Sequence, residues 1–169
     1  MAVEAPIQGL GNGFVILGRS TLTAVGDTMP ITIPPGYTFL RVYVNAIQSG
    51  SIQACLHFNG DTAANYSYRR SADGGADGTS GGSNQLALQA AASHSAFAVV
   101  DILNLATQEK LAIAQCTKVG TAGAANVGNR YELTGKWANT TDLITSVNVF
   151  NLSTGDFAAG SSAIVLGML

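Results

Sequence analysis

Apolar and polar residues alternate along several segments of the chain with a period of two. In residues 39–47 the apolar side chains Leu40, Val42, Val44 and Ala46 are separated by Arg41, Tyr43 and Asn45. Successive side chains of a β-strand point to opposite faces of the sheet, so this alternation predicts a strand with one buried face.

A second alternating segment, residues 51–58, follows a turn at residues 48–50. Its apolar side chains, expected to point inward, are Ile52, Ala54, Leu56 and Phe58, and Cys55 and His57 fall on the outward face. Two alternating segments joined by a short turn are typical of a β-hairpin. We therefore expect residues 39–47 to pair with residues 51–58.

Residues 130–137 show the clearest alternation. Tyr131, Leu133 and Trp137 lie on one face, and the opposite face carries Arg130, Glu132, Thr134 and Lys136. One face is therefore expected to be buried and the other charged. The inward phase of Trp137 predicts that this indole packs in the core.

Other segments extend the β pattern. Strands are expected at residues 21–24, 29–33, 96–102, 111–117, 144–150 and 163–166, with a break at the Pro-Pro-Gly of residues 34–36. Residues 84–93 and 103–110 are also compatible with a short helical turn. The Gly- and Ser-rich residues 71–83 have the composition of a flexible loop.

The length of 169 residues suits one domain with a sizeable core. Eight or so short strands predict an all-β fold, an antiparallel β-sandwich spanning residues 21–169. Residues 1–20, which contain several glycines, are expected to form an N-terminal arm.

Charge is sparse: Asp, Glu, Lys and Arg make up 11% of the chain, against about 25% in average proteins. Either Ser, Thr, Asn and Ala form much of the surface, or neighbouring subunits cover it. The net charge is -2, and the only basic pair is Arg69-Arg70, which argues against a nucleic-acid partner. No apolar run reaches the ~18 residues of a membrane helix, and Glu4 does not fit a signal peptide, so we expect synthesis in a cytosol and no membrane partner.

A Gly-x-Ser-x-Gly pattern centred on Ser80 matches the serine motif of hydrolases, which requires a strand before the serine and a helix after it. Neither is predicted here, and the chain offers only His57 and His94 as bases. The interpretation is that Ser80 belongs to a loop and that both histidines are ordinary polar residues. We expect no catalytic residue.

Asp61, Asp73 and Asp77 could offer oxygens to a cation such as Ca²⁺, but their spacing matches no known calcium loop. Turn formation is the favoured role, so no metal or cofactor is predicted, and cation binding stays open. Cys55 and Cys116 are expected to be free thiols.

Exposed aromatic side chains could stack on a sugar. The candidates are Tyr66, Tyr68 and Trp137, and for all three packing within the protein is the favoured interpretation.

Four short motifs occur in order along the chain. They are Phe58-Asn-Gly-Asp61 with Asn65-Tyr66, then Trp137, then Ile144-Thr-Ser-Val147, and finally Asp156-Phe-Ala-Ala-Gly-Ser161. Their order and spacing resemble those of virion structural proteins of tailed bacteriophages, over most of the chain from about Leu40 onward. The resemblance implies a jelly-roll-like β-sandwich, in which Asn59, Gly60, Asp61, Asn65 and Tyr66 shape a turn and the start of a strand.

The resemblance also implies a non-enzymatic role in the virion. We expect a capsid cement or decoration protein, made in the host bacterial cytoplasm and located on the capsid surface. Its expected partners are the phage major capsid protein and further copies of itself, as a homotrimer. A tail, baseplate or fibre attachment protein is the alternative, followed by a carbohydrate-binding module.

Overall fold

The structure is a computed structural model, and it describes residues 13–169. These residues form fourteen β-strands and no helix. In chain order the strands are β1 (Val15–Thr21), β2 (Thr28–Thr32), β3 (Phe39–Ala46), β4 (Gln48–Ser49), β5 (Ala54–Phe58), β6 (Tyr66–Ala72), β7 (Gly78–Ser83), β8 (Leu86–Ala87), β9 (Ser95–Leu103), β10 (Lys110–Val119), β11 (Asn129–Trp137), β12 (Ser146–Asn151), β13 (Asp156–Phe157) and β14 (Ser162–Met168).

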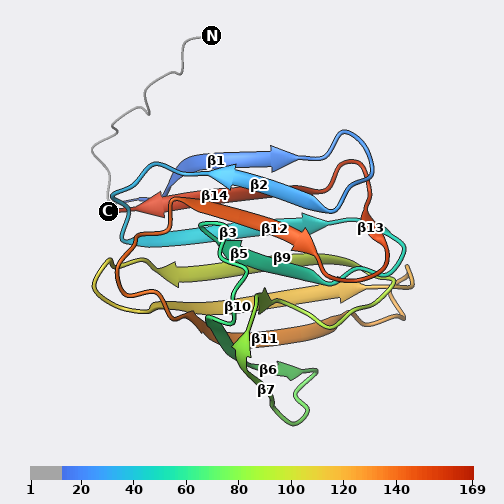
Figure 1. Ribbon diagram of the computed structural model, residues 1–169. Coiled ribbons are helices and arrows are strands. Elements are labelled where there is room, and N and C mark those ends of the chain that lie inside the picture. The colour runs from blue at the N-terminus through green and yellow to red at the C-terminus, as the bar shows by residue number, and fades with distance from the viewer. Residues whose placement is uncertain (1–12) are drawn as a thin grey trace.

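The strands build two layers (Figure 1). One is an eight-stranded sheet in the order β1-β14-β3-β9-β10-β11-β6-β7, and the other is a four-stranded sheet in the order β2-β12-β5-β8. The short strands β4 and β13 pair at one end of the molecule. The strand pairs are antiparallel, which confirms the predicted all-β antiparallel β-sandwich. Jelly-roll connectivity stays a prediction.

One hydrophobic core joins the two layers. Val42 and Val100 of the large sheet and Val147 and Val149 of the small sheet are completely buried in it. The alternation predicted for β3 and β11 is confirmed, and the inward side chains expected of β5 are also buried, although Cys55 on its outward side is buried as well. Trp137 is only 1% exposed, so its predicted place in the core is also confirmed.

The predicted hairpin is wrong. β3 lies between β14 and β9 in the large sheet, whereas β5 lies between β12 and β8 in the small sheet. The chain crosses between the layers at Gly50, whose φ of 106° is the left-handed conformation that glycine tolerates best. This crossing packs closely on Gly155, the residue before β13. Alternation identifies the inward face of a strand but does not tell which of the two layers of a sandwich the strand belongs to.

Residues 71–83 form a hairpin rather than a loop. β6 runs to Ala72, the chain turns through Asp73 and Gly74 at positive φ, and β7 returns as an edge strand of the large sheet. The two segments considered for helical turns contain β8 and the start of β10 instead.

The N-terminal boundary also differs from expectation. Residues 15–20, predicted as part of an arm, belong to β1, which pairs with β14 in the large sheet. The rest of the predicted arm, residues 1–12, lies outside the described residues. Residues 22–24, predicted as strand, follow the end of β1. A helix long and apolar enough to span a membrane does not occur in residues 13–169.

Candidate interaction surface

Residues of the first two motifs meet around the carboxylate of Asp61. Trp137 Nε1 donates to Asp61 Oδ2 at 2.6 Å, Asn65 Nδ2 donates to the same oxygen at 2.9 Å, and the Ala63 N–H donates to Oδ1. Burial raises the pKa of the Asp61 carboxyl, but these hydrogen bonds outweigh it and hold the pKa below its ordinary value. The Tyr66 hydroxyl adds a link by accepting from the Phe58 N–H and donating to the Asp61 carbonyl.

Asn59 joins this turn to the entry of the neighbouring strand β12. Its Oδ1 accepts from the N–H groups of Thr145 and Ser146, and its Nδ2 donates to the Leu143 carbonyl at 2.8 Å. Its φ of 53° is a conformation that Asn adopts more readily than most residues. The motif therefore joins the turn after β5 to β11 and to the entry of β12, and its side chains serve the architecture of the sandwich.

The structure keeps the candidate catalytic residues apart. Ser80 lies in β7 at the edge of the large sheet, whereas His57 lies in β5 of the small sheet, where its ring stacks on Phe150 at 4.0 Å. Burial lowers the pKa of His57. His94 packs closely against Gly120, where a Cβ atom would lie 2.1 Å from Nε2.

The acidic candidates each have their own partners in the protein. Asp73 accepts from the N–H of Arg130 and from Asn129 Nδ2, and Asp77 forms an ion pair with Arg69 at 3.0 Å. Within residues 13–169 there is no group of three or more His, Cys, Asp or Glu side chains that could hold a metal ion.

The cysteines and aromatic candidates are largely enclosed. Cys55 and Cys116 are free and buried, and burial raises their pKa to about 12 and about 11, respectively. Cys55 was expected on the outward face of its strand, yet its exposed fraction is 0%. Trp137 and Tyr66 are each only 1% exposed, so they offer no platform to a sugar, and Tyr68 remains half-buried.

The outer side of the large sheet is unusually apolar. In β10 the small side chains Ala112 and Ala114 point into the core, while Leu111 and Ile113 point outward and are 51% and 64% exposed. The first half of β9 repeats this arrangement, with Ala96 and Ala98 inside and Phe97 outside, whereas its second half places Val100 and Ile102 inside and Asp101 outside. In antiparallel sheets with one solvated side, apolar side chains usually point inward and polar ones outward. Here large apolar side chains point outward instead.

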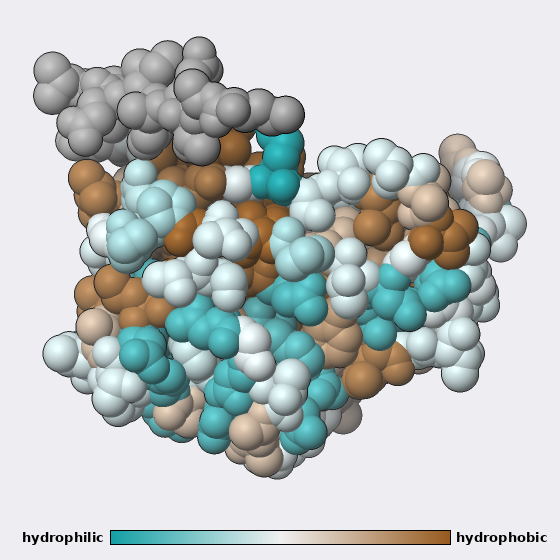
Figure 2. Space-filling view, turned by 45° about the horizontal axis from the view of Figure 1, so that its top comes forward, coloured by the Kyte–Doolittle hydropathy of each residue, from teal (hydrophilic) through white to brown (hydrophobic). Residues whose placement is uncertain are grey.

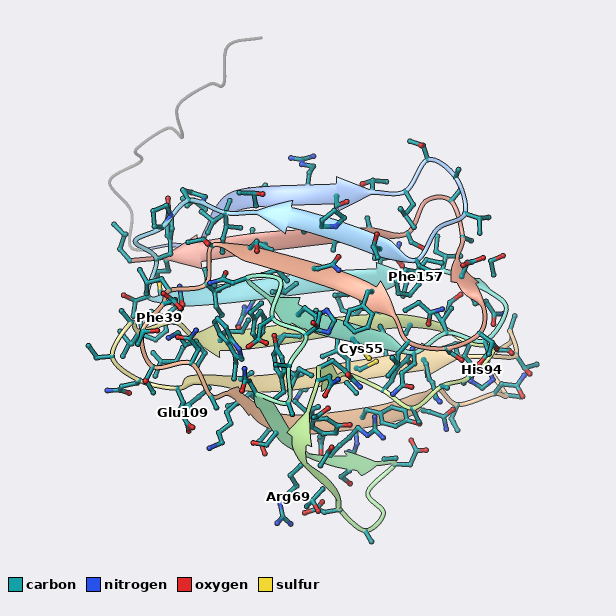
Figure 3. The ribbon with its side chains drawn as sticks, viewed as in Figure 1. Phe39, Cys55, Arg69, His94, Glu109 and Phe157 are labelled. Atoms are coloured by element: carbon teal, nitrogen blue, oxygen red, sulfur yellow. The ribbon has the colours of Figure 1, made fainter. Side chains whose placement is uncertain are left out.

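Cross-strand pairing gathers most of the outward apolar side chains at one end of the sheet, whereas Phe97 lies further along β9, opposite Asn45 and Thr117. Met168, Phe39, Leu103 and Leu111 lie opposite one another across β14, β3, β9 and β10. We call the outward side chains Phe39, Phe97, Leu103, Leu111, Ile113 and Met168 the apolar face. Figure 3 shows Phe39 at the start of β3, near one end of the sheet.

A shallow pocket of about 320 Å³ lies in the apolar face, between Phe39, Leu103, Leu111 and Met168. Arg41 and Asp101 form a two-pronged ion pair at its edge, with Nε–Oδ1 and Nη2–Oδ2 distances of 2.6 and 2.8 Å. The hydrogen bond to Asp101 raises the pKa of Arg41. Phe14 lies over the Arg41 guanidinium at 5.1 Å, so the pair is satisfied within the chain.

Charged residues border the apolar face on β11 and β6 and in the adjoining turns. Ion pairs join Arg69 to Asp77 and Lys136 to Glu109. Figure 3 labels Arg69 near the bottom of the view and Glu109 at the lower left. Two further shallow depressions of about 280 and 350 Å³ lie among these polar residues. Figure 2 looks toward the four-stranded sheet and the upper edge of the molecule, and hydrophilic and neutral residues dominate the lower part of that view.

The fold and this surface define a small β-sandwich with an exposed apolar face and a charged border. Comparison of the chain with protein-family models, curated proteins and solved structures finds no match.

Proposed function

We propose that this protein is a non-enzymatic structural protein of a tailed-bacteriophage virion and that it acts as a capsid cement or decoration protein. The proposal rests on the motif resemblance and on the apolar face. In the structure the motif residues Asn59, Asp61 and Trp137 hold the sandwich together through their hydrogen bonds. This is the role expected of them in a structural protein.

The apolar face is the observation that carries the proposal. Water-exposed apolar surface costs roughly 25 cal/mol per Å² relative to burial, so a contiguous face of this kind favours assembly. The low content of charged residues, 11%, points in the same direction. A subunit whose surface is covered by other subunits in an assembly needs fewer surface charges for solubility.

In this proposal the protein sits on the capsid surface, as a homotrimer in contact with the major capsid protein. Weak contacts repeated over a lattice act together, because each bound contact raises the local concentration of the next. The rigid sandwich then reinforces the head shell by burying surface between subunits, without chemistry.

The test uses virions of the phage that encodes this protein, prepared with and without it. Purified protein should bind the deficient particles, restore their resistance to heat, and give density on the head by electron microscopy. Ser80→Ala protein is the control for catalysis and should behave identically, because the proposed role needs no serine nucleophile. Density on the tail would replace the decoration role with the tail alternative, and absence from both sites would refute the proposal.

A further inference from the structure

We propose that the apolar face is the surface through which copies of this chain bind one another. The proposal rests on the self-association in the proposed function and adds the surface that carries it. The occupant is a second copy of the chain, docked on the outer side of β3, β9, β10 and β14.

The phase of the strands is the first argument. A sandwich that worked as a monomer would gain stability by turning Leu111 and Ile113 inward, because larger apolar side chains contribute more on burial. The chain instead places Ala112 and Ala114 in the core and leaves Leu111 and Ile113 at least half exposed. With apolar side chains on both of its faces, β10 has the pattern of a strand that is buried on both sides. A second molecule covering the outer side of the sheet would bury Leu111 and Ile113.

The available area is the second argument. Phe39, Phe97, Leu111 and Ile113 are between 42% and 64% exposed, and Phe14 and Ile16 beside them are 36% and 55% exposed. Large apolar side chains can bury ~150–250 Å² each, so these six leave on the order of 500–600 Å² open. A stable interface takes ~800 Å² from each partner. The apolar face, together with Phe14 and Ile16, therefore supplies most of one side, and its charged border supplies the rest.

Charge is the third argument, and it selects a copy of the same chain. A surface that meets itself must not present an unbalanced charge, because like charges would then face each other. The charges within the apolar face, Arg41 and Asp101, neutralise each other through two hydrogen bonds. The border likewise pairs Arg69 with Asp77 and Lys136 with Glu109.

The same surface can serve every copy in a closed assembly. A rotation axis through or beside the apolar face lets each subunit present identical residues to its neighbour. Two sheets that pack face to face lie ~10 Å apart with their outer side chains interdigitated. The depression between Phe39, Leu103 and Leu111 is a place where a neighbour's side chain could insert.

The test compares two matched leucine variants by sedimentation velocity over a concentration series. Leu111 in the apolar face is 51% exposed, and Leu152, which follows β12 of the other sheet, is 48% exposed. Wild-type protein should self-associate, Leu111→Glu should weaken this on the order of a hundredfold by burying an unpaired charge, and Leu152→Glu should match wild type. A wild type that stays at 17.3 kDa at high micromolar concentration, or equal behaviour of both variants, overturns the proposal.

Thiol labelling gives a second readout that does not depend on a disruptive charge. The native cysteines are buried, so a maleimide dye reports on an introduced cysteine. Ile113→Cys should label more slowly as the protein concentration rises through the association range, whereas Leu152→Cys should not change. Protection of Ile113→Cys in a monomer would mean that the chain itself covers the face, and free labelling at every concentration would leave the face to another partner. Both results overturn the proposal.

Binding to deficient particles separates this inference from the proposed function. Protein that binds particles but does not self-associate through the apolar face retains the function and loses the inference. Protein that self-associates through this face but never binds particles does the reverse.

Discussion

Replacement of Trp137 by Phe should destabilise the protein through the loss of one hydrogen bond and through the cavity that the smaller ring leaves. The indole is 1% exposed, and its Nε1–H donates to Asp61 Oδ2 at 2.6 Å. Phe keeps an aromatic ring in the core but has no donor. Asp61 then retains only its bonds from Asn65 and Ala63.

The magnitude follows from two contributions. A hydrogen bond to a charged group contributes ~1.5–3 kcal/mol, and because Asp61 is partly exposed and water can replace the donor, we take about 1.5 kcal/mol. The smaller ring leaves a cavity worth roughly 1–2 kcal/mol, since complete truncation of Trp to Ala costs about 3–5 kcal/mol. The unfolding free energy should therefore fall by about 3 kcal/mol.

Urea unfolding followed by circular dichroism measures this change, because Trp137 is the chain's single Trp and its fluorescence disappears in the variant. A double-mutant cycle with Asp61→Ala isolates the bond and should give a coupling energy of about 1.5 kcal/mol. A coupling below ~0.5 kcal/mol, within the usual additivity error, would refute the role given to this bond.

The same cycle has a predicted pH dependence. The pKa of Asp61 is lower in the folded protein than in the unfolded chain, so its stabilisation is complete above the unfolded pKa of ~3.9. It is lost as the pH falls through the folded pKa. The stability difference between wild type and Trp137→Phe should therefore shrink below about pH 4. A constant difference down to pH 2 would contradict this account.

Three further predictions concern the turns and the candidate catalytic residue. Gly155→Ala should lower the melting temperature strongly, because its Cβ would lie 2.5 Å from the backbone N of Ser51, whereas Gly81→Ala, with open space around it, should not. In urea unfolding, Asn59→Ala should be less stable than Asn59→Gly by roughly 1 kcal/mol, because both lose the side-chain bonds but only Ala is strained at positive φ; equal stabilities would argue against strain. Ser80→Ala should show the same activity as wild type against a panel of esters, and a hydrolysis that disappears with this variant would identify Ser80 as a nucleophile.

The sequence predicted the strands well where one face is apolar and the other polar. β3 and β11 have this pattern, and the buried positions of Leu40, Val42, Leu133 and Trp137 follow from it. Pairing was harder to predict, because the pattern of β5 is equally compatible with either layer. Its partners are set by contacts far along the chain, such as the pairing of Leu56 with Val149.

Two features could not be read from composition. β7 consists of Gly, Ser and Thr, which are typical of loops, and it is a strand because β6 offers an unpaired edge. To predict the apolar face, one must know which side of β10 points inward. Leu111, Ile113, Ala112 and Ala114 are all apolar, so their alternation in size, rather than in polarity, was the available signal.

The place of β14 has a consequence for biosynthesis. β14 lies between β1 and β3, so the first described strand joins the sheet only through the last one (Figure 1). On the ribosome, more than a hundred residues must be translated after β1 before its partner β14 emerges. Pairings of such long range also slow folding, because loop closure precedes the contacts that reward it. The edge of the large sheet that β1 and β14 form is therefore absent for most of translation. Folding of this sheet is completed only after the chain reaches Met168.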